Sequence, residues 1–160
     1  MELYPLPDET KVSMLRKLAL FWDGQWFLRA VDMFGLESAM ELNAAVRNSF
    51  GRIEMRTILK AVGKKKADDL ADALRIIATH TELLLGPGAK ADYLLDQDRA
   101  RIIVRRCAAF EGAKRANLER HDQACVTCET LWDTWLGVLL PETDIDVQYP
   151  QRQGMGDPVC

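Results

Sequence analysis

The residues best suited to chemistry in this sequence are its four cysteines. They are Cys107, Cys125, Cys128 and Cys160. An ionised cysteine is a nucleophile, and its sulfur is also a ligand for zinc and other soft metal ions. Structural disulfides are rare in the cytoplasm. In a cytoplasmic protein these cysteines are therefore expected to be free thiols, metal ligands or nucleophiles.

One stretch, HDQACVTCETLWDTW from His121 onwards, places potential ligands at helical spacing. Positions i, i+4 and i+7 share one face of a helix, so His121, Cys125 and Cys128 are expected to line up. Trp132 and Trp135 continue the same stripe. The pattern predicts a metal-binding face, or alternatively a core stripe in which each cysteine is a small buried side chain.

A metal site in this stretch would need ligands from elsewhere in the chain. The predicted set is Cys107, Cys128, Cys160 and His121. Zinc is the candidate cofactor because it takes Cys and His ligands in a tetrahedral arrangement. A Cys-x-x-Cys pair without a second pair is a weak zinc signal. The other histidine, His80, is expected to cap a helix or to lie on the surface.

Cys107 is the candidate nucleophile. It is expected where a strand ends and a helix begins, where unpaired backbone N–H groups and the helix dipole favour a thiolate. A buried, inert thiol is the alternative. His121 or Glu129 would handle protons. The candidate catalytic residues are thus Cys107, Cys128 and Glu129.

Two tryptophans near the start of the chain are candidates for binding a substrate. Trp22 and Trp26 lie one helical turn apart, with Asp23 and Gly24 between them. A glycine inside a helix costs about 1 kcal/mol relative to alanine, which suggests close packing or a ligand near the backbone. The predicted substrate-binding residues are Trp22, Asp23, Trp26 and Arg106. Close packing of helices is the alternative.

The elements that must position these residues follow from the pattern of apolar residues. Helical spacing predicts helices over 9–34, 37–62 and 67–80, the first of them ended by Gly35. Glycine and proline predict a loop over 85–92. A β-hairpin should follow, and then a long helix broken near Gly112 or Asp122. The expected ranges are strands at 92–96 and 100–107 with a turn at 97–98, the long helix at 108–140, and a last strand at 145–150.

Length and composition limit the class of protein. The chain has 160 residues, 48% of them hydrophobic and 28% charged, with a net charge of −3. We expect a single domain over 1–160, with a helical half at 1–85 and the hairpin, long helix and last strand at 86–160. The order of elements predicts an α+β fold with N-terminal helices packed on a small antiparallel sheet.

The same features bear on partners and location. The charge balance disfavours nucleic acid as the main partner. The sequence contains no run of about 18 apolar residues, the length that a membrane-spanning helix needs. The N-terminus lacks the pattern of a signal peptide, which favours the cytoplasm. The expected partners are a small-molecule ligand and, through exposed apolar surface near the N-terminal tryptophans, a second copy of the chain as a homodimer.

Two groups of residues resemble a known family. One is FWDGQWFLRAVDMFGLESAMELNAAVRNSFGRIEMRTILKAVG, and the other is the order RRC, CETLW and GDPVC in the second half. Together they make most of the chain resemble short prokaryotic proteins near the L-2-amino-thiazoline-4-carboxylic acid hydrolase-like family. The layout is also similar to 4-vinyl reductase sensor domains and to trafficking-complex subunits.

This resemblance implies two different functions. The hydrolase branch implies opening of a cyclic amidine-like C=N bond by water, with Cys107, Cys128 and Cys160 matching its cysteines and Cys125 an addition of this sequence. The sensor branch implies a non-catalytic domain that binds a small molecule or a metal. Related sequences continue past the last cysteine into a short strand, so the resemblance also implies truncation after Cys160.

Overall fold

The predicted α+β class is confirmed. The computed structural model describes residues 3–96, 99–118, 120 and 122–160. These residues form five α-helices and one two-stranded antiparallel sheet. They divide into two compact units, Met1–Ala39 and Met40–Cys160, which are described one at a time. The expectation of a single domain stays a prediction.

The first unit consists mainly of helix α1 (Asp8–Phe34). Acidic residues in its first turn, Asp8 and Glu9, are favoured by the helix dipole. The helix ends at Gly35, which has a positive φ of 80° and donates its N–H to the carbonyl oxygen of Val31 at 2.9 Å. Both the predicted helix and its glycine end are therefore confirmed.

Helices α2 (Leu36–Ala61) and α3 (Leu70–Leu85) follow. The predicted second helix is confirmed to within one residue at each end. The predicted third helix begins later than expected because Asp69 caps it, accepting a hydrogen bond from the Asp72 backbone N–H at 2.8 Å. It also ends later, at Gly86.

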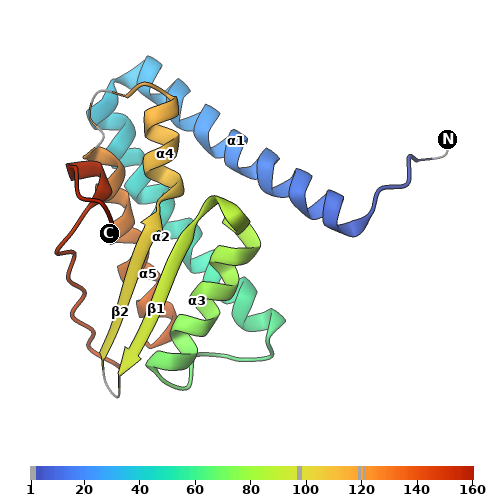
Figure 1. The fold of residues 1–160 in the computed structure, drawn as a ribbon, viewed down its shortest axis with the longest axis vertical. Helices are drawn as coiled ribbons and strands as arrows, with labels where there is room; N and C mark the ends of the chain where they lie inside the picture. The colour runs from blue at the N-terminus through green and yellow to red at the C-terminus, as the bar shows by residue number, and fades with distance from the viewer. Residues whose placement is uncertain (1–2, 97–98, 119, 121) are drawn as a thin grey trace. The chain divides into compact units, whose positions relative to one another are not determined.

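The predicted hairpin is confirmed as strands β1 (Lys90–Asp96) and β2 (Arg99–Arg106), paired with Tyr93 opposite Ile102. Strand β1 begins inside the predicted loop, whose first part forms the short 3-10 helix η1 (Gly86–Gly88). The predicted turn at 97–98 lies outside the described residues. Figure 1 shows the hairpin beside α3.

The predicted long helix is broken into α4 (Ala108–Arg115) and α5 (Gln123–Leu139). The break lies near Asp122, one of the two expected places, whereas Gly112 lies inside α4. Asn117 follows α4 with a left-handed φ of 54°, a conformation that asparagine adopts more readily than most residues and that ends a helix.

The predicted strand over 145–150 is wrong. The structure assigns no strand to this segment, although Ile145 and Val147 pack against the hydrophobic core. The alternation in the sequence therefore reflects the burial of every second side chain, not pairing in a sheet. The segment leads to the 3-10 helix η2 (Gln153–Met155) and the C-terminus, which returns along β2 in Figure 1.

The core of the second unit lies between α2, α3 and α5. Its most buried large side chains are Met55, Ile77 and Leu139, one from each helix. Ala67, three residues before α3 begins, donates its N–H to the Leu139 carbonyl oxygen of α5 at 2.9 Å. This core fixes α5, which carries two of the four cysteines.

Candidate functional site

Cys107 lies where the sequence predicts, between the end of β2 and the start of α4. It is the N-cap residue of α4, and its sulfur accepts a hydrogen bond from the Phe110 N–H at 3.5 Å. Burial nevertheless raises the pKa of Cys107, and this effect outweighs the hydrogen bonds from Phe110 and Ala109. The expected low pKa of Cys107 is therefore not found, and its role as a nucleophile stays a prediction.

Cys128 lies on α5 and is the most strongly perturbed thiol. Burial raises the pKa of Cys128 to about 12, with a further contribution from the charge that the other three cysteines would carry as thiolates. A hydrogen bond from the Trp132 side chain acts in the opposite direction. At neutral pH this sulfur is a thiol, which is a poor nucleophile.

Cys125 lies one turn earlier on the same helix. Burial raises the pKa of Cys125, and a hydrogen bond from the Gly154 backbone only partly opposes this. The charges of Cys160 and Cys107 also act on it. Cys125 therefore belongs to the same cluster, although the resemblance treats it as an addition of this sequence.

Cys160 is fixed to the end of the hairpin. Cys160 and Val104 exchange two backbone hydrogen bonds, of 2.8 and 3.0 Å, as opposite residues of antiparallel strands do. The Cys160 sulfur accepts a hydrogen bond from the Gln153 backbone N–H at 3.1 Å. The last residue of the chain is thereby anchored beside β2.

A buried amide, that of Gln153, joins the parts of this cluster. Its side-chain oxygen accepts the Cys107 N–H at 3.2 Å. Its side-chain nitrogen donates to the carbonyl oxygens of Arg105 at 3.0 Å and Pro158 at 3.1 Å. This residue could not be predicted, because nothing in the sequence distinguishes one glutamine of a turn-rich tail from another.

The structure thus brings all four cysteines together from three separate parts of the second unit. They come from the start of α4, from α5 and from the C-terminus, and all four are free and partly buried. We call Cys107, Cys125, Cys128 and Cys160 the thiol cluster. Each of the other three cysteines affects the pKa of Cys128, which places all four in one region, and a shared site of Cys107, Cys128 and Cys160 stays a prediction.

The thiol cluster is not a formed metal site. Among the described residues, no group of three or more His, Cys, Asp or Glu side chains is arranged to hold a metal ion. Three of the sulfurs, those of Cys107, Cys125 and Cys160, accept backbone hydrogen bonds. The fourth predicted ligand, His121, lies outside the described residues, so the complete predicted set stays a prediction.

Glu129, the predicted acid or base, is already paired. Its carboxylate forms an ion pair with Arg152, whose guanidinium also lies 5.4 Å from the centre of the Tyr149 ring. The structure therefore gives no support to Glu129 as a free proton acceptor.

The predicted substrate-binding residue Arg106 is exposed at the end of β2.

The remaining predicted substrate-binding residues belong to the first unit. Trp22, Asp23 and Trp26 all lie on α1, where Trp22 is exposed. Within the first unit, a Cβ atom added to Gly24 would meet no described atom within 4 Å, and both the nearby ligand and the close packing of helices stay predictions. A shared site of these residues with the thiol cluster stays a prediction.

A second polar cluster, not predicted from the sequence, lies inside the core of the second unit. The Glu54 carboxylate accepts a hydrogen bond from the Trp135 indole N–H at 2.9 Å and lies 3.5 Å from the His80 Nε2. All three side chains are buried, so the prediction of a capping or surface role for His80 is wrong. The sequence feature that could have revealed this cluster is helical spacing, which places Glu54 and Trp135 on the buried faces of their helices.

The charge state of Glu54 follows from this environment. Burial alone would raise the pKa of Glu54, but hydrogen bonds from His80 and Trp135, with positive charge from His80 and Arg47, lower it below its ordinary value. The carboxylate is therefore ionised at neutral pH inside the core.

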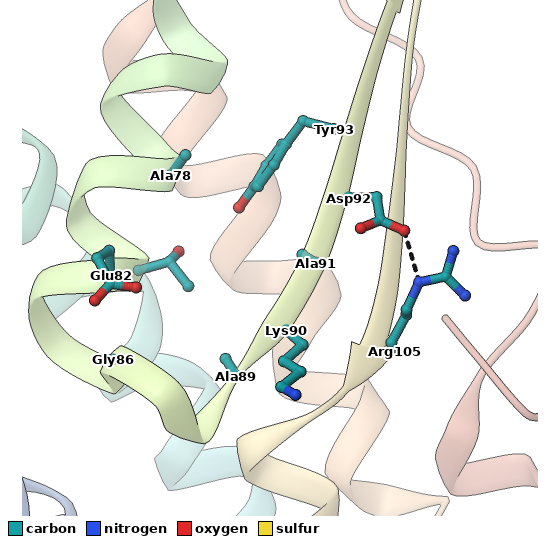
Figure 2. Close-up of a pocket in the computed structure, with 10 residues that line it drawn as sticks. Ala78, Glu82, Gly86, Ala89, Lys90, Ala91, Asp92, Tyr93 and Arg105 are labelled. Carbon is teal, nitrogen blue, oxygen red and sulfur yellow. Dashed lines mark hydrogen bonds and ion pairs between the residues drawn. The ribbon is translucent and has the colours of Figure 1, made fainter.

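A pocket of about 350 Å³ lies between α3 and the hairpin (Figure 2). Tyr93 points from β1 towards α3, and burial raises the pKa of its hydroxyl, which Thr81 partly opposes by a hydrogen bond. On the other side of β1, the Asp92 carboxylate binds the Arg105 guanidinium at 2.6 Å. No cysteine lines this pocket, so it is separate from the thiol cluster.

Comparison with models of protein families, with curated proteins and with solved structures finds no match. The resemblance described above therefore stays a prediction. Within the described part of the chain, no helix is both long and apolar enough to cross a membrane.

Proposed function

We propose that this chain is a non-catalytic sensor domain that binds a soft metal ion, with zinc as the first candidate, through the thiol cluster. The observation that carries the proposal is the convergence of all four cysteines from three distant segments. A set of thiols gathered in this way is typical of sites for soft metal ions, for which thiolates are preferred ligands.

The electrostatics of the cluster support the same proposal. The pKa of Cys128 is raised by burial and also by the charge of the other cysteines, so several thiolates without a cation would repel one another. A bound divalent cation reverses this effect and deprotonates the thiols that bind it. The sulfurs of Cys107, Cys125 and Cys160 already accept backbone hydrogen bonds, which a metal-bound thiolate can also accept.

Hydrolysis of a thiazoline-carboxylate or cyclic amidine is the alternative function. It rests on the position of Cys107 at the start of a helix. Against it stand the raised pKa of Cys107 and the ion pair that occupies Glu129. A Cys107→Ser variant that retained full hydrolytic activity would exclude Cys107 as the nucleophile.

The proposal also concerns location and partners. Four free thiols persist in a reducing compartment, which favours the cytoplasm. The homodimer and the small-molecule ligand remain further proposals, and the pocket beside α3 is the place where such a ligand would be sought.

The test is a zinc titration of tag-free protein purified under reducing conditions, in competition with a chromophoric chelator. We expect about one zinc ion per chain for the native protein and a loss of at least tenfold in affinity for Cys128→Ala, since one ligand is removed. Asp92→Asn, in the separate pocket, is the matched control and should bind zinc like the native protein. Absence of zinc binding by the native protein would contradict the proposal.

A further inference from the structure

Strand β1 has an outer edge whose backbone groups are unpaired. Val104 exchanges two backbone hydrogen bonds with Cys160, so the N–H and C=O of Val104 point away from β1. Hydrogen-bonded and non-hydrogen-bonded pairs alternate along an antiparallel ladder. Ala91 lies opposite Val104 and therefore directs its own N–H and C=O away from β2. By the same alternation Tyr93 and Leu95 do so too, and the described residues offer these groups no hydrogen-bond partner.

The two edges of the sheet therefore differ. The outer edge of β2 pairs with Cys160 at the end of the chain, whereas the outer edge of β1 is open within the described part of the chain. An unpaired strand edge is a template on which another extended chain can form backbone hydrogen bonds.

A groove lies between β1 and α3. Two adjacent pockets, of about 350 and 220 Å³, share Ala78 and Tyr93 and together follow β1 along α3. One end is apolar, where Leu74 and Leu95 line it, and Lys90 lines the other end. Figure 2 shows Tyr93 pointing across this space towards Ala78. We call it the α3–β1 groove.

We propose that the α3–β1 groove binds an extended peptide of a partner protein, which adds a strand to the outer edge of β1. A small molecule would fill the pockets but leave the backbone groups of β1 unpaired, whereas an extended peptide satisfies both. It would exchange two backbone hydrogen bonds with each of Ala91, Tyr93 and Leu95. This inference does not depend on the proposed metal site.

The side chains along the groove indicate the chemistry of the peptide. In an antiparallel arrangement, peptide side chains opposite Tyr93 and Leu95 lie on the face towards α3, beside Leu74, so apolar residues are expected there. Strand β1 begins with Lys90 and ends with Asp96. A peptide with a basic N-terminal end and an acidic C-terminal end would place each charge opposite a residue of unlike charge.

The probe is a heptapeptide with this pattern, Lys-Val-Thr-Val-Lys-Thr-Glu, with a fluorophore at its N-terminus and an amide at its C-terminus. Fluorescence anisotropy measures its binding, and hydrogen exchange of the protein amides shows where it binds. We expect saturable binding of about one peptide per chain, with slower exchange at the amides of Ala91, Tyr93 and Leu95.

Two N-methylated peptides test the backbone pairing without changing the protein. Methylation of both valines removes N–H groups that would point at β1, whereas methylation of the first threonine and the second lysine removes N–H groups that would point away from it. The two peptides carry the same number of methyl groups. We expect the first to bind at least about tenfold more weakly than the unmodified peptide, and the second to bind within about twofold of it.

Ala78→Phe tests the groove itself. The added ring would fill the space between α3 and Tyr93, so the heptapeptide should bind at least about tenfold more weakly. Thr79→Phe, exposed at the next position of α3, is the matched control and should bind the peptide like the native protein.

Each outcome bears on the proposal. Absence of saturable binding, equal effects of the two methylated peptides, or native affinity in Ala78→Phe would each overturn it. If Ala78→Phe does not fold, the methylated peptides decide alone. Sedimentation of the native protein without peptide completes the test, because a dimer with slow exchange at the β1 amides would show that a second copy occupies the edge and would also overturn the proposal. Zinc titration is a separate measurement, so failure here leaves the proposed function standing.

Discussion

Buried ionisable groups in this chain differ in charge according to their hydrogen-bond partners. Burial raises the pKa values of Cys107, Cys125 and Cys128, which favours their neutral thiols. Glu54 is also buried, yet the pKa of its carboxyl is lowered because Trp135 and His80 surround it with hydrogen-bond donors. Partners, and not residue type, thus determine whether a buried group is charged.

The charge of Glu54 predicts a pH dependence of stability. The pKa of Glu54 is lower in the folded protein than in the unfolded chain, so its ionised form stabilises the fold. This stabilisation is complete above the pKa of the unfolded chain, about 4.3, and is lost as the pH falls through the pKa of the folded protein. Glu54→Gln removes this contribution and should lower the free energy of unfolding at neutral pH by about 1.5–3 kcal/mol.

Urea unfolding at a series of pH values measures this effect. The difference in stability between the native protein and Glu54→Gln should shrink as the pH falls below about 4. Glu41→Gln, exposed on α2, is the control and should follow the native curve. An unchanged difference across the acid range would contradict the assignment of an ionised Glu54.

At the scale of elements, the distance between α2 and α5 depends on one glycine. A Cβ atom added at Gly51 would lie 3.1 Å from Leu131 Cδ1 and 3.2 Å from Thr134 Cγ2. Gly137 on α5 is different, since a Cβ atom there would meet nothing within 4 Å among the described residues. Both glycines lie inside helices, but only Gly51 allows a close approach of two helices.

The two glycines therefore predict opposite effects of substitution. Gly51→Leu should lower the free energy of unfolding by about 1–3 kcal/mol, because the added carbons force α2 and α5 apart. Gly137→Ala should raise it by about 0.5–1 kcal/mol, because alanine is the better helix former. Chemical denaturation of both variants tests this, and equal effects of the same sign would contradict the packing described for Gly51.

At the scale of the molecule, the second unit is closed by its own C-terminal segment. The buried Gln153 side chain binds the backbone at Arg105, Cys107 and Pro158, and Cys160 pairs with β2. The thiol cluster exists only while this segment stays in place. The site is therefore a product of tertiary closure and not of one local motif.

Gln153→Glu tests this closure. The change keeps the shape but replaces the donating nitrogen with a second carboxylate oxygen, which would face two carbonyl oxygens. We expect at least a tenfold faster cleavage of the C-terminal segment by a protease, together with weaker zinc binding. Gln151→Glu, exposed in the same segment, is the control. Unchanged cleavage and zinc binding would show that Gln153 does not hold the segment.

The sequence by itself determined most of the local structure. Apolar spacing predicted α1, α2 and the hairpin, because the periods of helix and strand are properties of a few consecutive residues. It also placed Cys107 between a strand and a helix, and Cys125 and Cys128 on one helix. It failed at residues 145–150, where alternate burial imitates the pattern of a strand.

Only the tertiary structure decided the chemistry of the site. The pKa of Cys107 depends on burial by segments far away in the sequence, and the partners of Gln153 and Glu54 come from distant elements. The unpaired hydroxyl of Tyr149 is likewise invisible in the sequence, because an absent hydrogen bond is a property of three-dimensional surroundings. Periodicity encodes which face of an element is buried, whereas desolvation and hydrogen bonding depend on what covers that face.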